Sequence, residues 1–133
     1  VLFRSLGLSL YPHHLKGGSA CSLADYCDMA ARAVDVMGAG NVGIGSDLCQ
    51  DQPDSIVEWM RVGRWTKAID YGEGSADAPG FPPMPDWFGD NRDFGNIAEG
   101  LKNRGMNEAE VAGIMGGNWM RFYADSFGPE GAI

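Results

Sequence analysis

The chain has 133 residues, which is enough for one small domain. Its 18 acidic and 10 basic residues give a net charge of −8, which argues against a nucleic-acid partner. Apolar residues make up 44% of the chain, which excludes a disordered protein, and no apolar run approaches the ~20 residues of a membrane span.

Residues 1–5 (Val-Leu-Phe-Arg-Ser) lack an initiating methionine and the basic region of a signal peptide. The end of a common sequencing adapter encodes the same residues. We therefore expect residues 1–5 to be non-native and residues 6–133 to be a segment of a longer protein. An internal fragment boundary or a cloning scar is the alternative, and the coding DNA distinguishes these origins.

A strand followed by a helix is predicted at the start of the native sequence. Residues 6–11 alternate apolar and small side chains, which is typical of a short strand, and residues 12–18 follow as a loop. Ser22 and Asp25 have the spacing of a helix N-cap and its partner, and Gly38 is expected to end the helix. The apolar residues of the predicted buried face are Leu23, Tyr26, Cys27, Ala30, Val34 and Met37.

A second strand is predicted at residues 42–45, and it leads directly into Asp47. A short helix is expected to start at Pro53. The apolar residues on one side of that helix are Ile56, Trp59 and Met60. We assign residues 48–92 to a long active-site loop, because their second half lacks periodicity and is rich in proline.

The last third of the chain is predicted to be helical. The apolar residues that share one face of the first helix are Ile97, Ala98 and Leu101. Gly105 is expected to end this helix, and Asn107 with Glu110 is expected to cap the next one. Because glycine is costly inside a helix, the pair Gly116 and Gly117 predicts a break or kink there.

This order of strands and helices indicates parallel β/α units. We expect residues 6–11 and 42–45 to be neighbouring parallel strands that a helix connects. Two strands cannot form a stable parallel sheet alone, since both faces need cover. The predicted fold class is therefore α/β, as the C-terminal portion of a (β/α)8 barrel, whose complete form takes about 250 residues.

Two motifs invite a cofactor or metal interpretation. Residues 38–43 match the dinucleotide pattern GxGxxG, but a nucleotide site needs a helix that starts at the glycines, and here the helical pattern precedes them. We interpret residues 38–43 as a helix end and a turn. His13 and His14 are adjacent, so both cannot easily bind one ion, although each can line the mouth at the end of the first strand.

The three cysteines, Cys21, Cys27 and Cys49, are irregularly spaced and have no histidine partner at the spacing of a zinc site. We interpret them as small buried apolar residues. They are too few for a disulfide scaffold, which favours a reducing, cytoplasmic compartment.

Asp47 is the sharpest candidate for chemistry. It follows an apolar strand at the edge where barrels place active sites, and Gly43 and Gly45 leave room for a ligand. A carboxylate there can hold an ammonium group, orient water or shuttle a proton, while a simple turn aspartate is equally compatible. Tyr11 and His13, at the end of the first strand, join Asp47 as candidate substrate-binding residues.

Three motifs resemble those of the zinc-dependent membrane (renal) dipeptidase family. Residues 42–47 (VGIGSD) resemble its VGxGxDFDG strand, residues 96–105 its NIxxGLxxRG helix, and residues 108–121 its closing ExxxxxIxGGNxxRV segment. The similarity extends from residue 6 to about residue 123. The three motifs lie in the family's order and at its spacing, which makes the resemblance fairly specific.

Two departures lie beside the expected pocket and leave substrate preference open. Residues 48–50 (Leu-Cys-Gln) replace the family's Phe-Asp-Gly, and residues 63–92 are more numerous than the matching segment of the animal enzymes.

The resemblance implies the C-terminal part of a bacterial-type member, with the (β/α)8 barrel of metal-dependent hydrolases. Two zinc ions of the whole protein would activate a hydroxide that attacks the peptide carbonyl of a dipeptide. Asp47 matches the aspartate of the last strand, which contacts substrate and is the expected proton shuttle. The family's zinc ligands and substrate-binding arginine all precede the strand matched by residues 6–11. We therefore expect no metal ligand in this segment and no activity from it alone.

Two other function classes stay open at this point. One is a barrel-derived binding protein that has lost the metal chemistry, and the other is a nucleotide-dependent oxidoreductase that uses residues 38–43. We expect a dipeptide substrate and neither a nucleic-acid nor a membrane partner, with a homodimer open for the whole protein. Expressed alone, the segment is expected to fold poorly or aggregate, because residues 6–11 would expose a strand edge.

Overall fold

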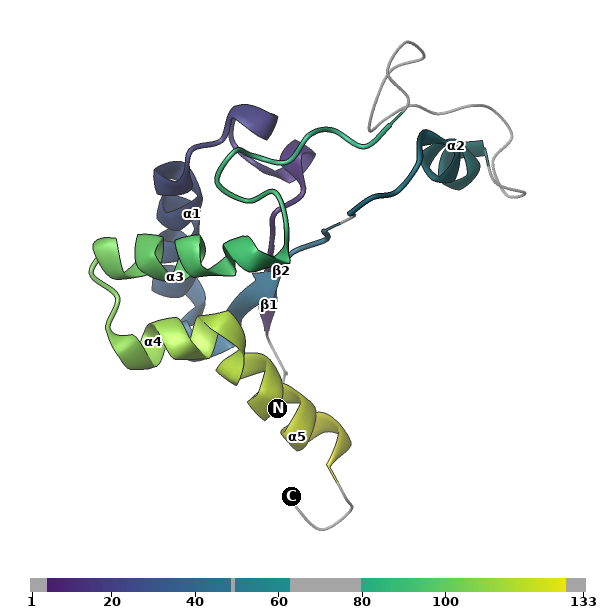
Figure 1. Cartoon of the computed structure of the whole chain (residues 1–133). Coiled ribbons are helices and arrows are strands. Elements are labelled where there is room, and N and C mark those ends of the chain that lie inside the picture. Colours follow the sequence, from purple (N-terminus) through teal and green to yellow (C-terminus); the bar gives the residue numbers. More distant parts are fainter. Residues whose placement is uncertain (1–4, 49, 63–79, 129–133) are drawn as a thin grey trace.

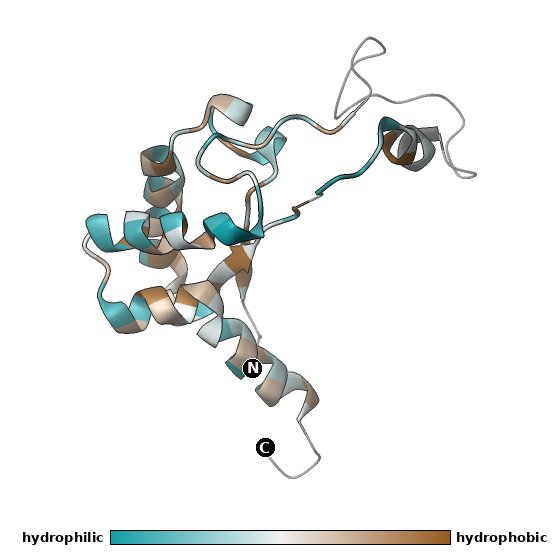
Figure 2. Ribbon diagram, viewed as in Figure 1, coloured by the Kyte–Doolittle hydropathy of each residue, from teal (hydrophilic) through white to brown (hydrophobic). Residues whose placement is uncertain are grey.

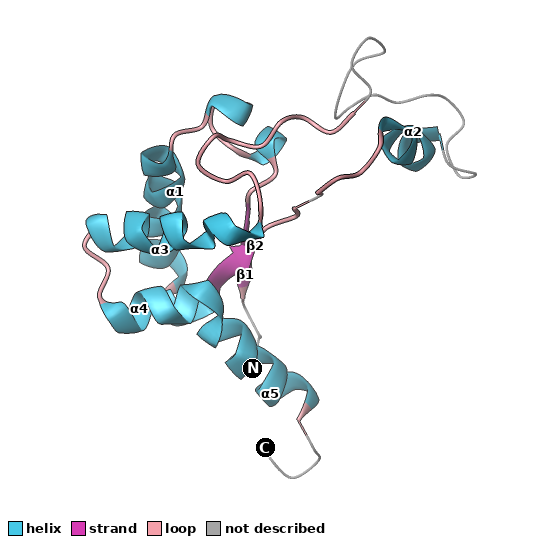
Figure 3. Ribbon diagram, in the orientation of Figure 1, coloured by secondary structure: helices cyan, strands magenta, loops and turns pink. Residues whose placement is uncertain are grey.

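The computed structural model of the chain describes residues 5–48, 50–62 and 80–128 (Figure 1). These residues form a two-stranded sheet and several helices, so the content is mixed α and β (Figure 3). Strand β1 spans Leu6–Ser9 and strand β2 spans Val42–Gly45, and the two pair in parallel. The predicted parallel pairing is therefore confirmed.

Strand β1 ends at Ser9 instead of Tyr11 because the chain turns back on itself there. The backbone N–H of Tyr11 donates to Ser9 Oγ at 3.1 Å, and a 3-10 turn, Pro12–His14, follows at once. A second short 3-10 turn spans Gly18–Ala20. The predicted loop is thus made mostly of tight turns.

Helix α1, Leu23–Met37, connects the two strands and has the predicted ends. Ser22 Oγ accepts a hydrogen bond from the backbone N–H of Asp25 at 3.1 Å. At the other end Gly38 takes a φ of 81°, a left-handed conformation in which glycine is favoured. Tyr26, Cys27 and Ala30 are buried, as the predicted apolar face requires.

The C-terminal third forms helices α3 (Phe94–Asn103), α4 (Glu108–Ala112) and α5 (Asn118–Phe127). Asn107 and Glu110 cap α4 reciprocally, with both side chains accepting backbone N–H groups. A π-helical turn, Gly113–Gly117, separates α4 from α5, and Gly116 has a non-helical φ of 157°. The predicted helix break is therefore confirmed.

The core lies on one face of the sheet. Side chains of Leu8 and Val42 point to this face, since paired residues of in-register parallel strands project to the same side. Figure 2 shows part of β2 in brown, the hydrophobic end of the scale. The buried residues that gather here from α1, α3, α4 and the turn after α4 are Tyr26, Ala30, Ile97, Leu101, Val111 and Ile114.

The other face of the sheet carries only small residues, which are Gly7, Ser9, Gly43 and Gly45. Trp119, at the start of α5, covers the part of this face that Gly7 and Gly43 form. A Cβ atom placed on Gly7 would lie 3.3 Å from Trp119 Cζ2. The indole N–H of Trp119 also donates to the carbonyl of Ile44 at 2.9 Å.

Two segments of the predicted loop 48–92 are described. Helix α2, Asp54–Val62, stands apart from the other helices (Figure 1), and it buries Val57 while Ile56 and Trp59 stay exposed. Residues 80–93 instead pack onto the core: Phe88 is fully buried, and the Trp87 indole N–H donates to the carbonyl of Cys21 at 2.7 Å. This second part of the loop is therefore fixed to the body of the molecule.

Several predictions fall on residues outside the described ranges. These are residues 1–4 of the segment expected to be non-native, Cys49, the side chain of Met60, and residues 63–79. Cys21 and Cys27 are described, and both are buried free thiols, as predicted. Within the described part of the chain, no helix is long and apolar enough to cross a membrane.

Candidate active site at the strand ends

The candidate site lies where the two parallel strands end. Ser9 and Gly45 form the last pair of the ladder. Tyr11 and Asp47 each come two residues later, so both leave the sheet at its carboxyl edge. The parallel pairing therefore brings the ends that carry two predicted site residues to one edge, as expected for the active-site end of β/α units.

Asp47 is exposed at this edge and has an unusual backbone. Its φ is 51°, in the left-handed region that few residues other than glycine adopt. Aspartate and asparagine tolerate this conformation better than most residues. The loop thus presents the carboxylate to solvent beyond the last residue of β2, where it is available to a ligand.

Tyr11 is buried, and aromatic rings surround its side chain. The centroid of its ring lies 5.8 Å from that of His13, 5.6 Å from that of His14 and 6.5 Å from that of Phe81. Phe81 belongs to the segment that folds back onto the core. Tyr11 therefore acts as the anchor around which the end of β1 and the loop residue Phe81 pack.

His13 and His14 are both exposed on the 3-10 turn after β1, so His13 lies at the predicted edge. The structure adds a contact that the sequence did not predict. His14 Nδ1 lies 2.9 Å from Ser9 Oγ, so His14 is tied to the last residue of the strand. The signal for this contact was Pro12, because a proline that begins a tight turn folds the following residues back over the strand end.

The described residues do not form a metal site. They contain no group of three or more histidine, cysteine, aspartate or glutamate side chains placed to hold an ion. Asp47, Tyr11 and His13 stay candidates for contact with a substrate.

Two hollows of the described surface lie away from the strand ends. One, of about 400 Å³, lies between α1 and α3 beside Cys27 and Arg104. Burial raises the pKa of the Cys27 thiol to about 11, which makes it a poor nucleophile at neutral pH. The other, of about 290 Å³, lies below the start of β2, beside Gly40 and Arg121. Proteins built of β/α units place their catalytic residues at the carboxyl ends of the strands, and neither hollow lies there.

The glycine motif at residues 38–43 has the predicted context. Helix α1 ends at Met37, a short 3-10 turn spans Ala39–Asn41, and strand β2 follows. No regular α-helix begins at these glycines, so the motif lacks the helix N-terminus that a pyrophosphate needs.

Comparison with solved structures adds one similar fold. The chain is similar to an amidohydrolase from Pseudomonas aeruginosa, with a TM-score of 0.75 and 24% sequence identity. The match covers 91% of this chain and 35% of that protein, so the chain spans about a third of its length. The match shows the fold. No family model and no curated protein match the sequence.

Proposed function

We propose that this chain is the C-terminal part of a metal-dependent hydrolase of the membrane dipeptidase type, whose barrel hydrolyses dipeptides. The observation that carries the proposal is the position of Asp47, exposed at the carboxyl end of a strand that pairs in parallel with β1. The similarity to an amidohydrolase supports the proposal at the level of fold. The three dipeptidase-like motifs support the choice of substrate class.

Asp47 has the chemistry that dipeptide hydrolysis requires at this position. A carboxylate can form an ion pair with the ammonium group of a dipeptide, and it can carry a proton to the amine that leaves. Tyr11 and His13, at the end of the neighbouring strand, would form the adjoining wall of the pocket.

The zinc ions implied by the resemblance do not fit the described residues, which hold no cluster of ligands. No step is therefore assigned to a metal here. The ligands would have to come from the remainder of the whole protein, and the segment alone is expected to be inactive.

The test is to recover the gene upstream of residue 6, produce the whole protein, and compare dipeptide hydrolysis by wild type and Asp47→Asn. Asparagine tolerates the left-handed backbone of Asp47, so the change removes the charge and the base while keeping the loop. Loss of general acid–base catalysis typically slows a reaction by about 10²–10⁴-fold.

The matched control is Asp51→Asn. Asp51 is also exposed, belongs to the same loop and has a φ of 53°. We expect this control to keep wild-type activity, and both variants to keep the zinc content of the wild type. Asp47→Asn within about threefold of wild type would refute the assignment. Loss of zinc from this variant would instead make Asp47 a ligand.

A further inference from the structure

Helix α5 has an apolar face that is largely exposed. Met120, Tyr123 and Phe127 are 72%, 54% and 78% exposed. The rings of Trp119 and Tyr123 lie 6.2 Å apart, as do those of Tyr123 and Phe127, so they form one stripe along the helix. Large contiguous apolar patches on a protein surface usually mark an interaction site. We call Trp119, Met120, Tyr123 and Phe127 the α5 stripe.

The charged residue Arg121 is not part of the stripe. Its guanidinium donates to the carbonyl of Gly40, which ties α5 to the turn before β2, and to Asn118 Oδ1 within α5 itself. Arg121 therefore lies on a different side of α5 from the stripe.

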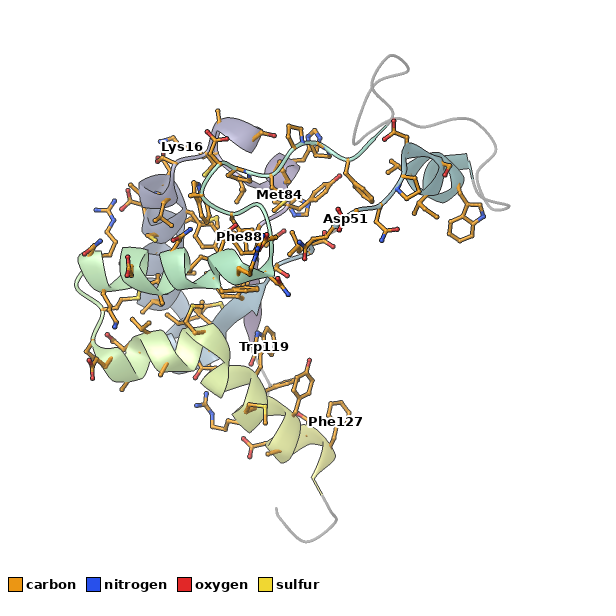
Figure 4. All side chains as sticks on the ribbon, in the orientation of Figure 1. Lys16, Asp51, Met84, Phe88, Trp119 and Phe127 are labelled. Atoms are coloured by element: carbon orange, nitrogen blue, oxygen red, sulfur yellow. The ribbon has the colours of Figure 1, made fainter. Side chains whose placement is uncertain are left out.

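Trp119 connects the α5 stripe to the glycine face of the sheet. Its indole packs over Gly7 and Gly43, the second residue of each strand, so it lies near the amino ends of both strands. Figure 4 shows Trp119 beside the sheet and Phe127 near the far end of α5. The stripe thus runs from the sheet outward past the amino ends of the strands.

The glycine face is the one that would face the interior of a barrel. Helices α1, α3 and α4 all pack on the opposite face, and helices lie outside the strands in a (β/α)8 barrel. The indole of Trp119 is therefore placed inside such a barrel, at the mouth formed by the amino ends of the strands.

We propose that the α5 stripe closes this amino-terminal mouth by packing against the barrel strands that the chain lacks. The proposal rests on the larger barrel of the proposed function, but it does not depend on the reaction. The similar amidohydrolase has about two thirds of its length outside the match, which is enough to supply the missing strands. Strands of parallel sheets are rich in valine, isoleucine and leucine, and an uncharged aromatic stripe complements them.

Cysteine labelling in the whole protein tests the proposal. Phe127→Cys would place a thiol on the α5 stripe, and Val36→Cys is the matched control, because Val36 of α1 is an apolar residue that is 84% exposed. We expect a maleimide to modify residue 127 at least about tenfold more slowly than residue 36, as judged by peptide mass spectrometry. Equal rates would overturn the proposal.

A second measurement shows whether the α5 stripe packs against the rest of the barrel or against a second copy of the chain. Phe127→Lys is expected to lower the unfolding temperature of the whole protein by about 5–10 °C, while Val36→Lys changes it little. A Phe127→Lys variant that turns a dimer into a monomer of unchanged unfolding temperature would assign the stripe to self-association and refute the proposal. A protected residue 127 in a protein that hydrolyses no dipeptide would refute the proposed function alone.

Discussion

Replacing Gly43 by alanine should destabilise the fold by displacing Trp119. A Cβ atom on Gly43 would lie 2.8 Å from Trp119 Cε2 and 2.9 Å from Cδ1, and closer still to Nε1. Real Cβ atoms essentially never approach other atoms this closely, so the indole must move and its hydrogen bond to the Ile44 carbonyl is lost. Overpacking costs about 1–3 kcal/mol and a lost hydrogen bond about 1 kcal/mol, so the free energy of unfolding should fall by about 2–4 kcal/mol.

The matched control for this change is Gly45→Ala. A Cβ atom on Gly45 would find its nearest neighbour, Gly7 Cα, at 3.5 Å, which is ordinary van der Waals contact. Both glycines lie on the same face of β2, so alanine reduces the entropy of the unfolded chain equally in the two variants. The difference between them therefore isolates the clash with Trp119.

The assay is urea unfolding of the whole protein, followed by tryptophan fluorescence. We expect a lower midpoint for Gly43→Ala and a midpoint near that of the wild type for Gly45→Ala. In a protein that already carries Trp119→Ala, adding Gly43→Ala should lower the free energy of unfolding little further, since the clashing ring is gone. Equal midpoints for the two single variants would refute the packing of Trp119 on the glycine face.

Two further predictions concern α4 and the thiol of Cys27. Asn107→Ala should lower the free energy of unfolding by about 1 kcal/mol, because Asn107 Oδ1 accepts the backbone N–H of Glu110 at 3.0 Å. Asn107→Asp should keep the cap, so equal losses of stability in both variants would contradict this role. Because burial raises the pKa of the Cys27 thiol from 9.0 to about 11, its contribution to stability is complete below pH 9.0 and is lost as the pH rises toward about 11. Thermal unfolding across this range should show a steeper fall for the wild type than for Cys27→Ala, and parallel curves would argue against the shift.

The sequence predicted the features of the fold that depend on neighbouring residues. The caps at Ser22 and Asn107 and the helix break at Gly116 all agree with the structure. Each depends on a few residues whose side chains or backbone preferences act locally, which is why short patterns were sufficient.

Apart from the parallel pairing of β1 and β2, which the order strand, helix, strand predicts, the sequence did not predict contacts between distant segments. Trp87 reaches Cys21 across 66 positions, and Trp119 reaches Ile44 across 75 positions. Such pairs have no local pattern, because the partner is chosen by the packing of the whole chain. The same holds for the candidate site. The position of Asp47 could be predicted from the strand before it, whereas the contact of His14 with Ser9 could not. The catalytic role of Asp47 stays a prediction.

The start of β2 depends on Asn118, a residue that is synthesised much later than the strand itself. The side-chain amide of Asn118 donates to the carbonyls of Ala39 and Val42 at 2.7 Å, and these partners precede it by 79 and 76 positions. While the ribosome is still translating that interval, β2 lacks the group that fixes its start, and each buried carbonyl without a partner costs about 1–3 kcal/mol. A nascent chain stopped before Asn118 would therefore leave both carbonyls without this partner, and the start of β2 would stay open to chaperones and proteases.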